Sequence, residues 1–152
     1  MSLQSVQDYF AAKAPEIDVI VTEASSATVD MAAEAHGVEP DRIAKTLCLR
    51  VGDEVILVVA AGKSRLDNKK FRAHFGTKPK MLDHHEVETI TGHPVGGVCP
   101  FGLANPLTVY CDLSIKAHTT VYPAAGATNS AVEIAPERLV DLTGARWADL
   151  CQ

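Results

Sequence analysis

Two features of the sequence could act on an ester or an anion, and the first is a single lysine. Lys45 lies at the start of an apolar run, between Ala44 and Thr46. An ammonium group is rarely buried without a partner, because its desolvation is costly. Position alone therefore allows two interpretations. The side chain extends to water from the end of a sheet, or it is a fixed cation directed at a phosphate or a polarised carbonyl.

The second feature is the stretch "GHPVGGVCPFG", residues 92–102, which holds four glycines and two prolines. Gly96 and Gly97 allow the backbone to approach a ligand closely, and Pro100 stiffens the far side. Such a loop can direct successive backbone N–H groups at one point, as in an oxyanion hole. The candidate donors are Gly97, Val98 and their neighbours. Considered alone, the pattern is more often that of a structural turn.

Cysteine and metal chemistry find less support in the sequence. Cys99, within the glycine stretch, offers a nucleophile only if a histidine lies close to it in space. The sequence identifies no such base, so a small residue that fills a tight turn is favoured. His84 and His85 are adjacent, and on a helix they would point about 100° apart. Because there is also no HExxH motif, the sequence predicts no metal site and no cofactor.

The composition is that of one globular domain. The chain has 152 residues, of which 47% are hydrophobic and 22% charged, so a single domain over 1–152 is expected. No apolar run approaches the roughly 20 residues of a membrane helix, and the start lacks the pattern of a secretion signal. The four cysteines form no CxxC pair, which favours reduced thiols. These features predict a cytoplasmic protein without a membrane partner.

The charge distribution is uneven. A formal net charge of -5 argues against a protein that coats DNA or RNA through bulk electrostatics. Seven basic residues nevertheless fall within eighteen positions: Lys63, Arg65, Lys69, Lys70, Arg72, Lys78 and Lys80. A solvated face is the favoured interpretation of this cluster. A local basic patch that holds one end of an RNA is the alternative.

Helical and strand patterns alternate irregularly along the chain. The clearest element is a hairpin over 43–62, which turns at Gly52–Asp53. Helices are expected at 5–14, 25–37, 68–75 and 84–91, and from Pro136 to 142; strands are expected at 17–23, 107–113, 119–123 and 130–135. Asp67 and Asp83 are the expected N-caps of the third and fourth helices. This order predicts an α/β (α+β) fold with a mixed, mostly antiparallel sheet surrounded by helices, and not a doubly wound parallel sheet.

Four ordered blocks resemble a known family. They are "HGVEPDRIAKTLCLR", "AAGKSRLDNKKF", "TGHPVGGVCPFGL" and "TVYPAAGATNSAVEIAPERLVDLTGA". With these blocks the chain resembles the YbaK family of trans-editing aminoacyl-tRNA deacylases, which is related to the editing domain inserted in bacterial prolyl-tRNA synthetases. Lys45 and Thr46 match the family's lysine and threonine, and Gly96 and Pro100 end its G-x-x-x-P motif. The resemblance implies a YbaK-like fold.

The resemblance also implies a reaction, which is hydrolysis of the ester between a wrong amino acid and the 3′ end of a tRNA, with tRNA-Pro expected first. The implied catalytic residues are Lys45, Gly96, Gly97, Val98 and Pro100. The implied substrate-binding residues are Thr46, Cys99, Gly126, Asn129 and Ser130. The partners implied are the aminoacylated tRNA acceptor end and an aminoacyl-tRNA synthetase. The base is hypothesised to be a ribose hydroxyl of the substrate.

One departure from the family bears on specificity. Many members carry a Gly-Gly turn followed by charged residues, whereas this chain has "AAGATNSAVEI". Small uncharged amino acids (alanine, cysteine, serine, threonine or a non-protein analogue) therefore all stay open as substrates. Two other functions also stay open. One is a non-catalytic module that binds an aminoacylated tRNA end or a small ligand, and the other is a cysteine hydrolase that uses Cys99.

Overall fold

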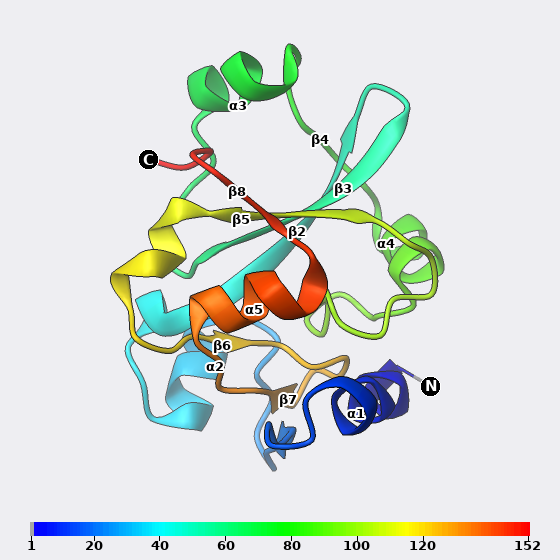
Figure 1. Cartoon of the computed structure of the whole chain (residues 1–152), viewed down its shortest axis with the longest axis vertical. Coiled ribbons are helices and arrows are strands. Elements are labelled where there is room, and N and C mark those ends of the chain that lie inside the picture. Colours follow the sequence, from blue (N-terminus) through cyan, green and yellow to red (C-terminus); the bar gives the residue numbers. More distant parts are fainter. Residues whose placement is uncertain (1) are drawn as a thin grey trace.

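The structure, a computed structural model, describes residues 2–152, so only residue 1 of the expected 1–152 domain lies outside it. A mixed sheet of six strands runs through the molecule, with helices on both faces (Figure 1). Its strands are β2 (Ile43–Val51), β3 (Glu54–Ala61), β4 (Lys80–Met81), β5 (Thr108–Asp112), β6 (Tyr122–Pro123) and β8 (Arg146–Ala148). The helices are α1 (Ser2–Lys13), α2 (Val29–His36), α3 (Asn68–Phe75), α4 (His84–Thr91) and α5 (Pro136–Thr143), with short 3-10 helices η1 (Pro40–Arg42) and η2 (Leu113–Ala117).

The strand order β4-β2-β3-β5-β8 confirms the expected mixed sheet. The antiparallel hairpin of β2 and β3 forms its centre and turns at Gly52, which has a φ of 60°. β4 joins β2 in the antiparallel sense, whereas β6 joins β2, and β5 and β8 extend from β3, in the parallel sense. The fold is therefore α+β, with the long hairpin as its scaffold.

Side-chain caps fix where the helices begin, as expected. The Asp67 carboxylate accepts the Lys69 and Lys70 N–H groups at the start of α3. Asp83 accepts the Glu86 N–H at the start of α4. Each capping oxygen satisfies a backbone donor that has no partner within the helix. The segment between α3 and α4 includes β4, which pairs with the edge of β2.

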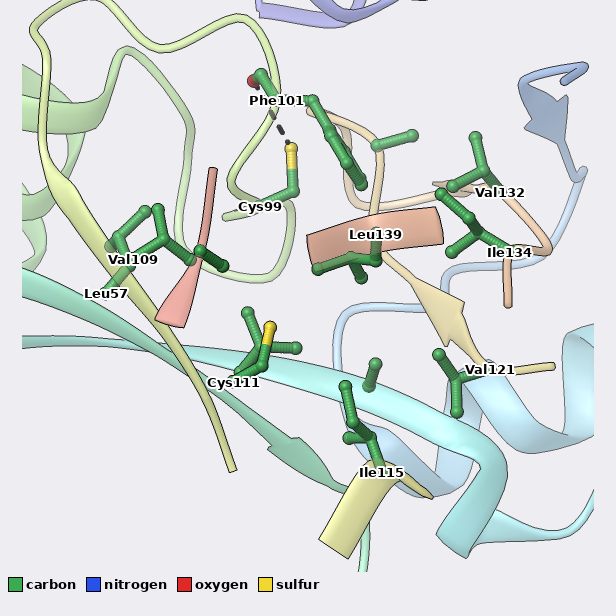
Figure 2. Close-up of a cluster of buried hydrophobic side chains, with 14 of the residues drawn as sticks. Leu57, Cys99, Phe101, Val109, Cys111, Ile115, Val121, Val132, Ile134 and Leu139 are labelled. Atoms are coloured by element: carbon green, nitrogen blue, oxygen red, sulfur yellow. Dashed lines mark hydrogen bonds between the residues drawn. The ribbon is translucent and has the colours of Figure 1, made fainter. Parts of the chain in front are cut away.

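The core lies on both faces of the hairpin. On one face, Figure 2 shows Leu57 of β3 and Cys111 of β5 beneath Leu139 of α5, and Val6 and Phe10 of α1 belong to the same cluster. On the other face, Leu49 and Ile56 pack with Phe71 of α3 and with Leu150. Burial of these apolar side chains stabilises the sheet by roughly 1.5–3 kcal/mol for each large residue.

Three strand predictions were wrong in extent, and two strands were not predicted. The strand expected at 17–23 is limited to β1 (Ile20–Val21), the one expected at 119–123 to β6 (Tyr122–Pro123), and the one expected at 130–135 to β7 (Ser130–Ala131). β1 and β7 pair with each other outside the main sheet. β4 and β8 were not predicted, because pieces of two and three residues show no readable alternation of apolar and polar positions.

The outer edge of β2 is open in its middle. β6 pairs with Ile43 and Ala44, and β4 pairs with Leu49 and Arg50. Among the described residues, no strand pairs on this side with 45–48. In a hairpin closed by a two-residue turn, every second residue directs its backbone N–H and C=O groups away from the partner strand. Val51 pairs with Glu54 at the turn and directs its groups toward β3. Counting back from Val51, the residues between 45 and 48 whose N–H and C=O groups point away from β3 are Thr46 and Cys48.

Candidate functional site

A cavity of about 290 Å³ lies beside this open edge. Its wall is formed by residues from 26–32, 43–48, 81–87, 95–98 and 122–131. Most of the lining is apolar, and the polar lining residues are Ser26, Thr28, Lys45, Thr46, His84, Tyr122 and Ser130. The cavity thus joins the β2 edge, the start of α2 and the glycine stretch, which are far apart in the sequence.

Lys45, the third residue of β2, is among the residues that line the cavity. Its Nζ donates to the carbonyl oxygen of Gly62 at 3.2 Å and to that of Ser64. Burial lowers the pKa of Lys45, and the nearby charge of Arg65 lowers it further, whereas Cys151 and Asp41 act in the opposite direction. An ammonium group has three N–H donors, so one donor stays without an acceptor among residues 2–152.

Thr46 extends from the opposite face of β2, because successive side chains on a strand alternate. Its Oγ1 is buried and, among the described residues, has no hydrogen-bond partner. A buried hydroxyl without a partner costs about 1–3 kcal/mol, so such a group is rare unless it has a role. The hydroxyl and the outward backbone groups of Thr46 are therefore candidates for contact with a polar ligand.

The glycine stretch supplies part of the cavity wall through Val95, Gly96 and Val98. Within residues 2–152, the N–H groups of Gly96 and Val98 donate to no protein acceptor. The N–H of Gly97, which we expected to face an oxyanion, donates instead to the carbonyl oxygen of Pro94 at 2.8 Å. This part of the expectation was wrong, because the turn over 94–97 uses that donor. Gly96 and Val98 are the amides left available.

Glycine is required at 96 for backbone conformation and at both 96 and 97 for packing. Gly96 has a φ of 95°, and a Cβ there would lie 2.9 Å from the Cβ of Ala27. A Cβ on Gly97 would lie 2.8 Å from the backbone nitrogen of Ala127. The carbonyl oxygen of Gly97 also accepts the Gly126 N–H at 3.0 Å. The stretch therefore packs directly against the turn over 126–129.

Cys99 belongs to the core and not to the cavity wall. Its side chain is 0% exposed and lies among the apolar residues of Figure 2, where its Sγ contacts the carbonyl oxygen of Phe101. Burial raises the pKa of the Cys99 thiol to about 12. His93 Nε2 lies 3.5 Å from this sulfur but only 2.7 Å from the Phe101 oxygen. A thiolate nucleophile is therefore disfavoured at this position.

His93 gives no functional signal in the sequence, and in the structure its role is to connect elements. It is 0% exposed, and burial lowers its pKa. Its Nδ1 is hydrogen-bonded to the Ser2 hydroxyl at the start of α1, while its Nε2 is bonded to the Phe101 oxygen. The neutral ring therefore ties α1 to the far end of the glycine stretch.

The other expected site residues surround the cavity and mostly do not line it. Ser130 lines it, although its hydroxyl is bonded to the backbone of Ala127. Asn129 donates from its side chain to the Thr22 carbonyl oxygen at 2.9 Å. Gly126 and Pro100 are buried outside the lining. None of these three residues lines the cavity.

The sequence did not predict several residues of the lining. The segment at the start of α2, from Ser26 to Val29, forms one side of the cavity. Tyr122 forms another, and its ring stacks on His36 at a centroid distance of 5.4 Å. Met81 lies at the rim and is 66% exposed. A proline-terminated strand motif around Tyr122 was visible in the sequence, but nothing local indicated which side it faces.

Two further kinds of feature are absent from residues 2–152. No cluster of three or more His, Cys, Asp or Glu side chains is placed there to hold a metal ion. No helix in this part of the chain has the length and apolar character needed to cross a membrane.

The chain is similar to several known proteins. The family model described as an aminoacyl-tRNA editing domain matches residues 23–142. The Bacillus subtilis (strain 168) protein named YwhH, of uncharacterized function, is 51% identical over 154 residues, which cover 100% of this chain and 98% of that protein. A candidate Cys-tRNA(Pro)/Cys-tRNA(Cys) deacylase of Enterococcus faecalis (strain ATCC 700802 / V583), EbsC, is 30% identical over 126 residues, with 81% of this chain and 76% of that protein covered.

A solved structure shares the fold closely. The crystal structure of a candidate trans-editing enzyme for prolyl-tRNA synthetase superposes with a TM-score of 0.91 at 32% identity. The superposition covers 99% of this chain and 97% of that one. With the family model spanning most of the sequence and the same fold in a relative, the chain belongs to the aminoacyl-tRNA editing domain family.

Proposed function

We propose that this protein is a trans-editing deacylase that hydrolyses mischarged aminoacyl-tRNA in the cytoplasm. Its substrate is tRNA-Pro that carries a small wrong amino acid. An aminoacyl-tRNA synthetase produces this mischarged tRNA and is the expected partner. A cavity of about 290 Å³ is at the lower end of the usual range for ligand pockets. Such a volume suits an aminoacyl group better than a whole nucleotide.

The observation that carries the proposal is the set of polar groups around the open edge of β2. Lys45 has one N–H donor left, Thr46 has a buried hydroxyl without a partner among residues 2–152, and Gly96 and Val98 have unused N–H groups. All four residues line one cavity. Positive charge and hydrogen-bond donors held in advance around a cavity stabilise the negative charge that develops on an ester oxygen.

Each group has a role in the proposed reaction. A water oxygen attacks the ester carbonyl carbon, and the N–H groups of Gly96 and Val98 donate to the resulting oxyanion. The bond between the carbonyl carbon and the ribose 3′ oxygen then breaks. The neighbouring ribose 2′-hydroxyl accepts a proton from the water and gives its own to the departing 3′ oxygen. The products are the free amino acid and an intact tRNA end.

Lys45 and Thr46 hold the substrate in this scheme. The remaining N–H of Lys45 binds the carbonyl oxygen or the phosphate of the terminal nucleotide. The substrate's α-ammonium donates hydrogen bonds to the Thr46 hydroxyl oxygen and to the outward carbonyl oxygen of Thr46. Positioning of this kind contributes to rate because the reacting groups are already oriented when the water attacks.

The two alternative functions differ from this proposal in a measurable way. A cysteine hydrolase needs a reactive thiol, and the buried Cys99 thiol with a pKa of about 12 holds almost no thiolate at neutral pH. A non-catalytic binding module would retain the cavity and bind the aminoacylated end without turnover. A measurement of amino acid release from the tRNA therefore distinguishes this binding module from the proposed enzyme.

A panel of mischarged tRNAs tests the proposal. tRNA-Pro carrying alanine, cysteine, serine or threonine is incubated with the wild type and with Cys99→Ala, and correctly charged Pro-tRNA-Pro serves as the control. We expect release of at least one small amino acid, with the rate unchanged within about twofold by Cys99→Ala. Binding without release on every substrate supports the module, whereas abolition of release by Cys99→Ala supports the cysteine hydrolase.

A further inference from the structure

The segment over 63–80 carries a charge opposite to that of the rest of the molecule. It holds seven of the fourteen Lys and Arg residues of the chain but only one of its nineteen Asp and Glu residues, Asp67. The structure places this segment between β3 and β4, with α3 as its centre (Figure 1). A positive region attracts a polyanion locally, even on a protein with a net charge of -5.

Six of the seven cations form what we call the basic surface. All six side chains are exposed, and they belong to Lys63, Arg65, Lys69, Arg72, Lys78 and Lys80. Within the described residues 2–152, none of the six side chains forms an ion pair or a hydrogen bond. The seventh cation, Lys70, instead binds Asp149 at 2.9 Å and the carbonyl oxygen of Cys151 at 2.8 Å.

Three arginines elsewhere on the molecule are paired with acids. Arg138 pairs with Glu16 at 2.9 Å, and Arg42 and Arg50 each pair with a glutamate at 3.4 Å. The single acid of the basic segment offers no such pairing, because the Asp67 carboxylate caps α3 through the N–H groups of Lys69 and Lys70. Lys69 and Arg72 are three residues apart on α3, where like charges are neighbours and repel. A bound polyanion would relieve this repulsion.

The basic surface adjoins the cavity at both ends of the segment. At its start, the carbonyl oxygens of Gly62 and Ser64 accept from the Lys45 ammonium, and the charge of Arg65 acts on that ammonium. At its end, Lys80 precedes Met81, which lines the cavity. Between these ends, α3 packs on the sheet through the buried Phe71, whose ring centroid lies 4.5 Å from that of Phe75.

The character of the surface favours RNA over a protein partner. Among the described residues, the large exposed hydrophobic side chains lie outside 63–80, whereas a stable protein interface has an apolar or aromatic centre. Lysine and arginine without an apolar centre are typical of contact with a phosphate backbone. We propose that the basic surface binds the phosphate backbone of the base-paired acceptor stem while the aminoacylated 3′ end enters the cavity.

This inference rests on the proposed function for the placement of the 3′ end, but RNA binding by the surface can be tested separately. The test variant is Lys69→Glu/Arg72→Glu, and the matched control is Lys13→Glu/Lys116→Glu, which makes the same change in net charge on other exposed positions. The probe is an uncharged RNA hairpin that copies a tRNA acceptor stem with its single-stranded 3′ end. Its affinity is measured at several salt concentrations between about 50 mM and 200 mM.

We expect the test variant to bind the hairpin at least about tenfold more weakly. The salt slope, which is the slope of the logarithm of affinity against the logarithm of salt concentration, should be smaller in magnitude by about 1 for each phosphate group that the variant no longer binds. The control should behave like the wild type. With an aminoacylated tRNA, the test variant should raise KM about tenfold and leave kcat unchanged. With an aminoacyl-adenosine ester, which has no stem, its kcat/KM should equal that of the wild type.

Three results would overturn the inference, and each is distinct from failure of the proposed function. The first is an affinity and salt slope of the test variant equal to those of the control. The second is tighter binding of wild type to polyglutamate of equal charge than to the hairpin, which indicates an acidic protein partner. The third is an equal loss of activity on the aminoacyl-adenosine ester. If no ester is hydrolysed by the wild type, the proposed function fails, while the hairpin measurement still decides the role of the surface.

Discussion

At the scale of single residues, the site consists of polar groups whose bonding is incomplete. Lys45 is anchored by two carbonyl oxygens and retains one donor, and Thr46 carries a buried hydroxyl with no partner among residues 2–152. Neither feature helps the fold. Desolvation opposes a partly buried ammonium, and an unpaired hydroxyl lowers the free energy of unfolding. Both are accounted for if a substrate completes the bonding.

Thr46 gives a prediction in which activity and stability change in opposite directions. Thr46→Val keeps the shape but removes the unpaired hydroxyl, so the free energy of unfolding should stay equal or rise by about 1 kcal/mol. The kcat/KM for deacylation should fall about tenfold, because the variant cannot form one hydrogen bond to the substrate. Urea unfolding and deacylation rates measure the two effects.

Thr46→Ser is the matched control, since it retains the hydroxyl and should keep most of the activity. If Thr46→Val left kcat/KM unchanged while lowering stability, the hydroxyl would be a structural group and not a substrate contact.

At the scale of elements, the glycine stretch is positioned by α1, which precedes the matched family region 23–142. A Cβ on Gly126 would lie 2.7 Å from the Ser2 carbonyl oxygen, and one on Gly102 would lie 2.8 Å from that of Ser5. Phe10 of α1 stacks on Phe101 at a centroid distance of 4.7 Å. These close contacts hold the wall that carries the Gly96 and Val98 amides.

His93 at the centre of this contact predicts a dependence of stability on pH. Burial lowers its folded pKa below the ordinary histidine value of 6.5, so the unfolded chain binds the proton more readily. The stability that neutral His93 contributes is therefore present above about pH 6.5 and is lost as pH falls through the lowered folded pKa. His93→Gln should reduce the free energy of unfolding by about 1–3 kcal/mol at pH 8, and the difference from wild type should shrink toward pH 5.

Chemical unfolding at several pH values measures this difference. The control is His85→Gln at an exposed position, which should match the wild type throughout. A constant difference between wild type and His93→Gln from pH 8 to pH 5 would contradict the account.

The sequence predicted the parts of the site whose signals are local. The caps at Asp67 and Asp83, the hairpin turn at Gly52 and the glycine stretch all depend on neighbouring residues. The open edge of β2 could not be predicted, because it depends on where two-residue strands stop pairing. The same is true of the bond between Ser2 and His93, whose partners are far apart in the chain.

At the scale of the whole molecule, the proposed function depends on two surfaces of different character. The cavity is small and largely apolar, and on our proposal it selects the amino acid by size and by a few polar contacts. The basic surface is exposed and charged, and on our inference it supplies affinity for the RNA. Because lysine and arginine contacts to phosphate are sensitive to salt, we expect KM for the tRNA substrate to rise with ionic strength while kcat stays nearly constant.

The central claim is that Lys45 and the amide wall of one cavity hydrolyse an aminoacyl ester. Single-turnover deacylation of a mischarged tRNA-Pro by wild type, Lys45→Met and the control Lys116→Met tests it most directly. We predict a rate constant about 100-fold lower for Lys45→Met, with the control unchanged and both variants folded by circular dichroism. Equal rate constants for Lys45→Met and wild type would contradict the account.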